Sequence, residues 1–340
     1  MTENVRIGIV GLGRLGKRHA LNLAGSVPGA SLIAAASPVE EERRWARDHL
    51  PQASSYASLE ELLRHDGLDA VWLVTPTSLH VEQIEAALLA GKHVFCEKPL
   101  ALTLESCDRV LELAEKRPRQ VAMIGFTRRF DPAYAMLKER IDAGELGRVY
   151  RLHFESHDPI DPHGFFVKFA PTSGGLFLDC GIHDVDLARW MAGNSRAVRV
   201  SASGCCHQYP GLAECGDIDT GVGTIEFENG LIATLFISRT SHRGYEATLW
   251  ANGTLGGMLA GKDIAAPALI AESGNMQHRQ GLPDFFARFS DAFLVEAKAF
   301  VDALRSGQPS PLTLADAREA TRIAIALREA YEGRRTIELD

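Results

Sequence analysis

The sequence predicts an α/β fold in which a domain built on a parallel sheet precedes an α+β domain with a mostly antiparallel open sheet. Through about residue 125, short apolar segments alternate with amphipathic helical segments, as in sheets covered by helices on both faces. Further on, Asn-Gly pairs at 229–230 and 252–253 separate strand-like segments, which is typical of antiparallel hairpins. The 340 residues suffice for two cores. We therefore expect domains at 1–125 and 126–340.

The composition excludes several classes of protein. With a net charge of -8, the chain is unsuited to nucleic acid or to an anionic membrane surface. It has no apolar run near the roughly 18 residues that span a bilayer. The six cysteines show no C-x-x-C spacing, and the adjacent pair Cys205-Cys206 is poorly suited to ligating one tetrahedral ion. We expect no metal, and a reducing cytoplasm as the setting.

The first strand and the loop after it carry the strongest local motif. Residues 5–10 form a β-branched apolar strand, followed by Gly11-Leu12-Gly13-Arg14-Leu15-Gly16 and a helical pattern. This G-x-G-x-x-G in a strand–loop–helix context is typical of a Rossmann dinucleotide site. Gly11 permits the turn, Gly13 lets the pyrophosphate approach the backbone, and Gly16 brings helix and strand together. The phosphates would lie at the helix N-terminus, where an anion is favoured.

The end of the second strand, residues 30–36, leaves the identity of the cofactor open. An acid that binds the adenosine ribose of NAD is usual there, but Ser37 stands at this position. A small hydroxyl could equally admit the 2′-phosphate of NADP, with Arg43, Arg44 or Arg14 as its counter-charge. Both Arg43 and Arg44 lie beside the three glutamates at 40–42, so a solvated helical face explains them equally well.

The following elements complete the first domain. A capping box at Ser58 predicts a short helix, and the strand at 68–74 ends at Thr75-Pro76. A helix at 79–90 ends at a left-handed Gly91, and the strand at 93–96 leads into Glu97-Lys98-Pro99. Ligands of open parallel sheets bind at the carboxyl ends of strands. Lys98 is therefore expected to face the cofactor crevice, on a turn that Pro99 stiffens and Glu97 anchors. A helix at 104–116 and a strand at 120–125 follow.

The second domain begins with an arginine pair and continues with strands. Arg128 and Arg129 point in different directions, so we expect one to enter the site and the other to pair with surface acids. Asp131 is the expected N-cap of the next helix. Residues 148–156 form a strand, two hairpins follow, and the chain ends in helices at about 283–305 and 314–331.

A candidate acid–base motif lies at Asp179-Cys180-Gly181-Ile182-His183. The apolar positions between 176 and 190 fit helical spacing. If one helix runs through Asp179, this carboxylate shares a face with His183 four residues later, with Asp186 near the same stripe and Asp184 pointing elsewhere. A carboxylate beside an imidazole is the equipment of a general base. The alternative, a surface helix with solubilising charges, loses weight because the dinucleotide loop precedes it.

Taken together, these motifs resemble the glucose–fructose oxidoreductase/inositol dehydrogenase/MocA family over essentially the whole chain, most nearly its bacterial inositol 2-dehydrogenases. The resemblance implies that Lys98, Arg128, Asp179 and His183 contact a polyol such as myo- or scyllo-inositol. It also implies that His183 takes a hydroxyl proton while hydride passes to NAD(P). Members of the family commonly pair their sheets, which implies a homodimer or homotetramer.

The resulting expectations cover three sets of residues. The catalytic residues are Lys98, Asp179 and His183. The substrate-binding residues are Arg128, His157, Asp158 and Tyr245. The cofactor-binding residues are Gly11, Gly13, Arg14, Leu15, Ser37, Arg43, Thr75, Pro76, His80, Glu97 and Lys98. NAD is expected to serve at least as well as NADP. Two other functions stay open: an NADP-dependent sugar or anhydro-ketose reductase of the same family, and a regulator that senses dinucleotides without catalysis.

Overall fold

The computed structural model describes residues 4–242, 244–261 and 282–340. They fall into two compact units, one with Met1–Thr127 and Asp291–Thr321, the other with Arg128–Ser290 and Arg322–Asp340. The expected boundary at residues 125/126 differs by two residues from the break after Thr127. A larger difference concerns residues 291–321, which we had placed in the second domain and which belong to the first unit.

The first unit is built on a parallel sheet with the strand order β3-β2-β1-β4-β5-β6 among the described residues. Its strands are β1 Val5–Val10, β2 Ala30–Ala36, β3 Ser54–Tyr56, β4 Ala70–Leu73, β5 His93–Glu97 and β6 Ala122–Gly125. The strand order reverses between β1 and β4, which creates the switch point where open α/β sheets bind their ligands. The glycine loop leaves β1 at this point.

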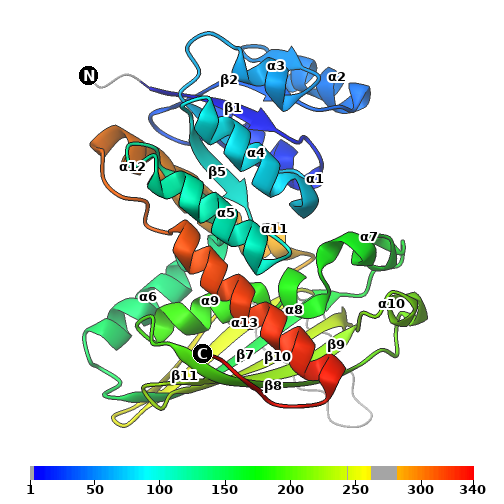
Figure 1. Ribbon diagram of the computed structural model, residues 1–340, viewed down its shortest axis with the longest axis vertical. Helices are drawn as coiled ribbons and strands as arrows, with labels where there is room; N and C mark the ends of the chain where they lie inside the picture. The colour runs from blue at the N-terminus through cyan, green and yellow to red at the C-terminus, as the bar shows by residue number, and fades with distance from the viewer. Residues whose placement is uncertain (1–3, 243, 262–281) are drawn as a thin grey trace. The chain divides into compact units, whose positions relative to one another are not determined.

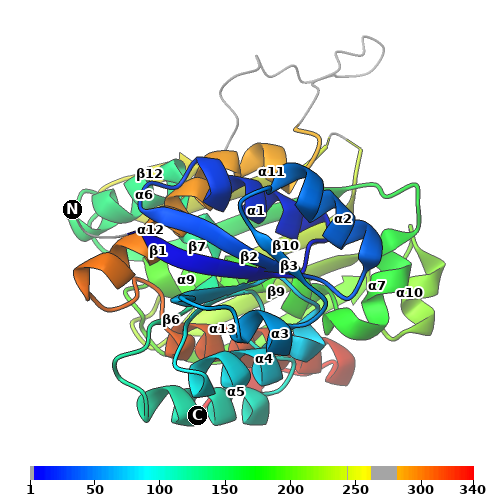
Figure 2. The ribbon, with the colours of Figure 1, turned by 90° about the horizontal axis from the view of Figure 1, so that it is seen from above.

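Helices cover both faces of this sheet. They are α1 Arg14–Gly25, α2 Glu40–His49, α3 Leu59–Leu63, α4 Thr77–Leu89, α5 Leu104–Glu115 and α12 Ser290–Ser306. Figure 2 shows α1 and α2 on one face and α3, α4 and α5 on the other.

Aromatic packing explains why α12 belongs to this unit. The Phe293 ring lies edge-on to His19 of α1, and the Phe300 ring lies edge-on to both Trp72 and Phe95 of the sheet. The apolar stripe of α12 is therefore buried against the parallel sheet.

The second unit is built on a sheet with the order β12-β11-β7-β10-β9-β8-β13 among the described residues. Its strands are β7 Val149–Pro159, β8 Ala197–Cys205, β9 Thr220–Phe227, β10 Ile232–Ser241, β11 Glu246–Gly253, β12 Gly257–Ala260 and β13 Ile337–Glu338. β7 and β10 are parallel, and the other pairs are antiparallel. The predicted hairpin joins β9 to β10 through Gly230, whose φ is +82°. The predicted fold class is confirmed.

Helices cover one face of this sheet. Helices α6 Pro132–Asp142, α7 Phe165–Ser173, α8 Leu176–Asp179, α9 Ile182–Met191, α10 Pro210–Glu214, α11 Phe285–Arg288 and the later part of α13 Leu314–Gly333 belong to the unit. In Figure 1, α6, α8, α9 and this part of α13 lie on the same side of the strands. Two glycines of β9 permit close packing there, because a Cβ on Gly221 would meet the Phe177 ring at 3.0 Å and one on Gly223 would meet Leu327 at 3.0 Å.

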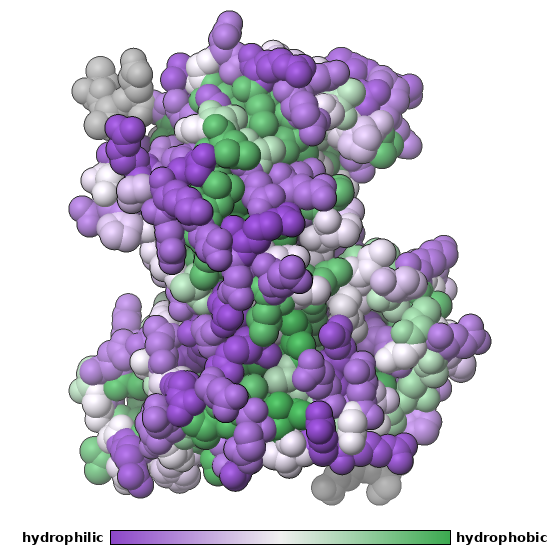
Figure 3. All heavy atoms as spheres, in the orientation of Figure 1, coloured by the Kyte–Doolittle hydropathy of each residue, from purple (hydrophilic) through white to green (hydrophobic). Residues whose placement is uncertain are grey.

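The other face of the sheet carries no helix among the described residues (Figure 1). Its strands direct Val222, Ile232 and Trp250 outward, and all three are exposed. On the side of the molecule that Figure 3 shows, hydrophilic residues predominate and apolar residues form small scattered groups. No helix in the described part of the chain is long and apolar enough to cross a membrane.

Candidate active site

The glycine loop in the first unit forms a cradle that fits a pyrophosphate. Gly11 has φ +91°, and a Cβ there would lie 2.2 Å from the carbonyl oxygen of Val74. A Cβ on Gly16 would lie 1.9 Å from the carbonyl oxygen of Gly11. Gly13 differs, because the nearest atom to its Cβ position is the Glu42 carboxylate at 3.9 Å. Gly11 and Gly16 therefore close the turn, while the side of Gly13 stays open at the N-terminus of α1.

His80 fixes the neighbouring loops. The imidazole is buried, with Nδ1 2.7 Å from the Pro99 carbonyl oxygen and Nε2 2.9 Å from the Thr75 carbonyl oxygen. Burial lowers the pKa of His80. Since Pro76 caps α4 and Pro99 follows β5, the ring ties together the carboxyl ends of two strands. His80, which we predicted to bind the cofactor, thus holds the loops that surround the cofactor site.

Glu97 anchors the turn that carries Lys98, as expected. One carboxylate oxygen accepts from the Lys98 backbone N–H at 3.3 Å, and the other lies 2.9 Å from His19 Nε2. Glu296 of α12 is fully buried, and burial together with the negative charge of Glu97 raises its pKa well above the ordinary value. Sequence reasoning missed Glu296, although an acid on the apolar stripe of α12 was a usable signal.

The Asp179–His183 motif is not one continuous helix. α8 ends at Asp179 and α9 begins at Ile182, so the predicted shared face of an uninterrupted helix is wrong. The break lies at Gly181, where a Cβ would come within 2.7 Å of both the Phe177 carbonyl oxygen and the Ile237 side chain. Glycine lets the turn pack tightly on β10. Asp179 therefore ends one helix, and His183 lies in the first turn of the next.

A buried arginine fixes the Asp179 carboxylate. Arg239 of β10 is fully buried and donates from Nη2 to Asp179 at 2.8 Å and from Nη1 to Asp217 at 3.2 Å. Burial alone would lower the pKa of Arg239, but the negative charges of Asp179 and Asp217 outweigh it and raise the pKa. Asp217 also accepts from the Leu176 N–H at 2.8 Å, at the start of α8. This network fixes both ends of α8.

Asp158 lies near this network, whereas His157 does not. The Cys180 thiol donates to Asp158 at 3.4 Å, and burial followed by the charge of Asp179 raises the pKa of Asp158 against the opposing effect of Arg239. His157 precedes Asp158 on β7, and its Nδ1 lies 3.0 Å from Ser238 Oγ. Because side chains alternate along a strand, His157 lies on the sheet face away from Asp158. On that face His157 also contacts the Phe236 ring.

Both members of the arginine pair are engaged with buried carboxylates. Arg128 forms an ion pair with Asp184 and donates to Tyr245 at 3.1 Å. Arg129 donates to both oxygens of Asp186, at 2.8 and 2.6 Å. The expectation of surface acids for one arginine is therefore wrong, because Asp184 and Asp186 face the core from α9.

Tyr245 and Arg128 lie together in the core, and their surroundings shift the pKa of each. Burial would lower the pKa of Arg128, but the negative charge of Asp184 and the hydrogen bond to Tyr245 outweigh this and raise the pKa. Burial raises the pKa of Tyr245 to about 12 although Arg128 opposes it. The guanidinium stays charged and the phenol stays neutral.

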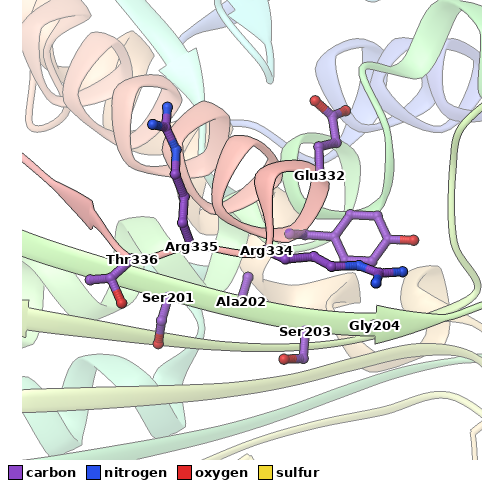
Figure 4. Close-up of a pocket in the computed structure, with 9 residues that line it drawn as sticks. Ser201, Ala202, Ser203, Gly204, Glu332, Arg334, Arg335 and Thr336 are labelled. Atoms are coloured by element: carbon purple, nitrogen blue, oxygen red, sulfur yellow. The ribbon is translucent and has the colours of Figure 1, made fainter.

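A cavity of about 810 Å³ in the second unit holds none of the predicted site residues. It lies between β8 and the segment after α13, and its lining includes Arg334 and Arg335. Figure 4 shows Ala202 on the helix side of β8 and the hydroxyls of Ser201 and Ser203 on the opposite side. The polar groups thus do not converge on a common point, although a substrate site requires such convergence.

The fold and these groups define a class of protein. A parallel sheet with a glycine cradle at its switch point binds dinucleotides. The second unit adds a fixed carboxylate and, four residues later, an imidazole. A dinucleotide cofactor together with an acid–base group is the equipment of a nicotinamide-dependent oxidoreductase.

Comparison with known proteins specifies the class. Residues 5–126 match the oxidoreductase family with an NAD-binding Rossmann fold, and residues 134–259 match the GFO/IDH/MocA C-terminal domain. The chain belongs to the GFO/IDH/MocA family of oxidoreductases. The predicted family, the predicted NAD-dependent dehydrogenase class and the NAD cofactor are confirmed.

The similarity to individual relatives extends over the full length. The scyllo-inositol 2-dehydrogenase (NAD(+)) of Bacillus subtilis is 35% identical, covering 100% of this chain and 98% of the relative. The myo-inositol 2-dehydrogenase of Thermotoga maritima is 32% identical over 99% of both chains. The structure of scyllo-inositol dehydrogenase from Lactobacillus casei with NAD(H) and scyllo-inositol is 36% identical, with a TM-score of 0.91 over 99% of both chains.

Proposed function

We propose that this protein is an inositol 2-dehydrogenase that oxidises one ring hydroxyl of myo- or scyllo-inositol to the ketone, with NAD as hydride acceptor. The observation that carries the proposal is the Asp179 carboxylate, which buried Arg239 fixes four residues before His183. Full-length similarity to relatives named for both inositol isomers supports the choice of substrate.

Each residue of the proposed catalytic set has a distinct role. His183 accepts the proton of the reacting hydroxyl. Asp179 accepts a hydrogen bond from the ring and thereby orients the polyol. Lys98 steadies the reacting or adjacent oxygen through its positive charge. Bound NAD supplies the hydride acceptor. The proton and the hydride leave the same CH–OH group, which becomes a carbonyl.

The proposed substrate contacts follow from the same geometry. Asp158 lies near Cys180 and feels the charge of Asp179, so it is suited to a second ring hydroxyl. Tyr245 offers a neutral phenol that Arg128 holds at 3.1 Å. We assign Arg128 to positioning Tyr245 and leave His157 out, because it lies on the other face of the sheet.

Self-association and location complete the proposal. The sheet face without helices has exposed apolar residues among charged ones, which suits contact with a second copy and then assembly into a dimer or tetramer. All six cysteines are free thiols, which suits a reducing cytoplasm.

A substrate panel tests the reaction. The full chain is incubated with myo-inositol, scyllo-inositol, other inositols and aldoses, each with NAD and with NADP, and the reduced nicotinamide is followed by absorbance. We expect the highest kcat/KM with an inositol and NAD. Faster turnover of an aldose, or turnover with NADP alone, would point instead to the sugar reductases of the family. Absence of any turnover together with tight dinucleotide binding would point to a sensor.

Replacement of His183 tests the proposed base. His183→Ala should lower kcat by about a hundredfold or more, the usual scale for lost acid–base catalysis, while NADH binding persists. His163→Ala is the matched control, since His163 is exposed in the same unit and should leave kcat unchanged. Turnover of the His183 variant within a fewfold of the parent enzyme would exclude the role.

A further inference from the structure

Ser37, at the position where an NAD-binding acid is usual, is not available to a ligand as a donor. Its side chain is 1% exposed. Its hydroxyl donates to Glu42 Oε2 at 2.6 Å and accepts from the Val39 N–H at 3.1 Å. A serine hydroxyl has a single proton to donate, and Glu42 takes it. The side chain that binds the adenosine ribose at this end of β2 must therefore belong to another residue.

The Glu42 carboxylate lies at this end of β2. It is the third residue of α2, and Ser37 fixes one of its carboxylate oxygens. The other oxygen is the nearest atom to the open side of Gly13, 3.9 Å from the Cβ position. The carboxylate thus lies between the end of β2 and the central glycine of the cradle. This is where an acid at the end of β2 would act in a dinucleotide fold.

Arg43, one of the three candidate cations for a 2′-phosphate, is already neutralised. Arg43 donates from Nη1 to the Ser37 carbonyl oxygen at 2.6 Å, and from Nε and Nη2 to the Glu40 carboxylate at 3.1 and 2.6 Å. A bidentate arginine is the best partner for a phosphate, but here the fork already holds a carboxylate. Arg43 is therefore not free to bind a phosphate, and the carboxylate nearest to the Cβ position of Gly13 is that of Glu42.

We propose that Glu42 is the residue that selects NAD over NADP. Its carboxylate accepts hydrogen bonds from the adenosine ribose hydroxyls and repels a 2′-phosphate, so it replaces the missing acid of β2. Ser37 is a positioning residue that holds the Glu42 carboxylate through its hydroxyl. This inference rests on the proposed NAD-dependent function but concerns only the nucleotide site.

Direct nucleotide binding tests the proposal without any polyol. Dissociation constants for NADH and NADPH are measured by nicotinamide fluorescence with the full chain. In Glu42→Gln, the ratio of the NADPH constant to the NADH constant should fall tenfold or more. Adding Ser37→Asp to this variant should restore the ratio, because it returns an acid to the end of β2.

The control is Glu41→Gln, which removes the same charge from the same helical turn at an exposed position. Its ratio should stay within twofold of the parent. The proposal is overturned if Glu42→Gln leaves the ratio within twofold, or if Glu41→Gln lowers it equally. Both constants come from one preparation, so partial loss of folded protein cancels in the ratio. The ratio of the two dissociation constants does not depend on whether the substrate is a polyol, so the test holds even if the proposed substrate is wrong.

Discussion

At the scale of single residues, Glu296 shows how burial controls a charge. Its carboxyl group is fully buried in α12, and burial followed by the charge of Glu97 raises its pKa well above the ordinary value. The folded state therefore keeps a proton that the unfolded state loses above about pH 4.5. By linkage, the proton on Glu296 stabilises the folded state fully below that pH. This stabilisation diminishes as pH rises towards the folded-state pKa.

Replacing Glu296 by glutamine should remove this pH dependence. Gln has nearly the same shape and needs no proton, so Glu296→Gln should stabilise the fold at pH 8 and do so less at pH 5. The gain in unfolding free energy should grow with pH by up to about 1.4 kcal/mol per unit. Denaturant unfolding from pH 5 to 8 measures it, with exposed Glu41→Gln as the control whose effect should stay flat. A gain that does not change with pH would contradict a raised pKa.

The candidate site residues divide by how visible they are in the sequence. Lys98, Asp179 and His183 stand in short motifs, so sequence reasoning could name them. Arg239 stands in no motif, and its importance comes from contacts with Asp179 and Asp217, which are distant in the chain. One signal was available. Arg239 follows Leu235 and Ile237 at the two-residue spacing of the inward face of β10, where a charge needs buried partners.

At the scale of elements, the glycine loop separates two kinds of glycine. Gly16→Ala should destabilise the fold by about 1–3 kcal/mol, because the new Cβ would lie 1.9 Å from the backbone carbonyl oxygen of Gly11. Gly13→Ala should cost less, about 0.5–1 kcal/mol, because Ala is a poorer N-cap than Gly although Gly13 has φ -66° and no atom nearer than 3.9 Å to its Cβ position. Thermal unfolding of the two variants compares them.

Nucleotide affinity should rank the same variants differently. The Cβ of Gly13→Ala enters the open side of the cradle, so its dissociation constant for NADH should rise tenfold or more although the fold is intact. Fluorescence titration measures this constant. An affinity equal to that of the parent would show that the pyrophosphate does not approach the backbone at Gly13.

The elements also show where periodicity alone fails. The sequence pattern predicted β1, β2, β4, β5 and β6 of the parallel sheet and the β9–β10 hairpin, because apolar runs and Asn-Gly turns are local features. It missed the short β3. It merged α8 and α9, because the break at Gly181 arises from packing against Ile237 in a distant strand. It assigned α12 to the second domain, because chain order says nothing of the contacts of Phe293 and Phe300 with the first sheet.

At the scale of the whole molecule, we propose that copies of the chain meet through the open face of the second sheet. Phe236 pairs with Val222 across β10 and β9, and both point away from the helices. Val222 is 47% exposed, and Ile232 and Trp250 are exposed on neighbouring strands. Arg199 and Glu226, on the strands β8 and β9, form an ion pair at 3.2 Å. An apolar centre within a polar rim is the usual anatomy of a protein interface.

A single charge on this face should therefore separate the copies. Light scattering of the parent at micromolar concentration should give the mass of two or four chains. In Val222→Arg the mass should fall, because burying an unpaired guanidinium in an interface costs several kcal/mol. Val295→Arg is the matched control, since Val295 is 45% exposed on α12 of the first unit and should leave the mass unchanged. A parent with the mass of one chain, or a Val222 variant that assembles like the parent, would show that this face does not hold the copies together.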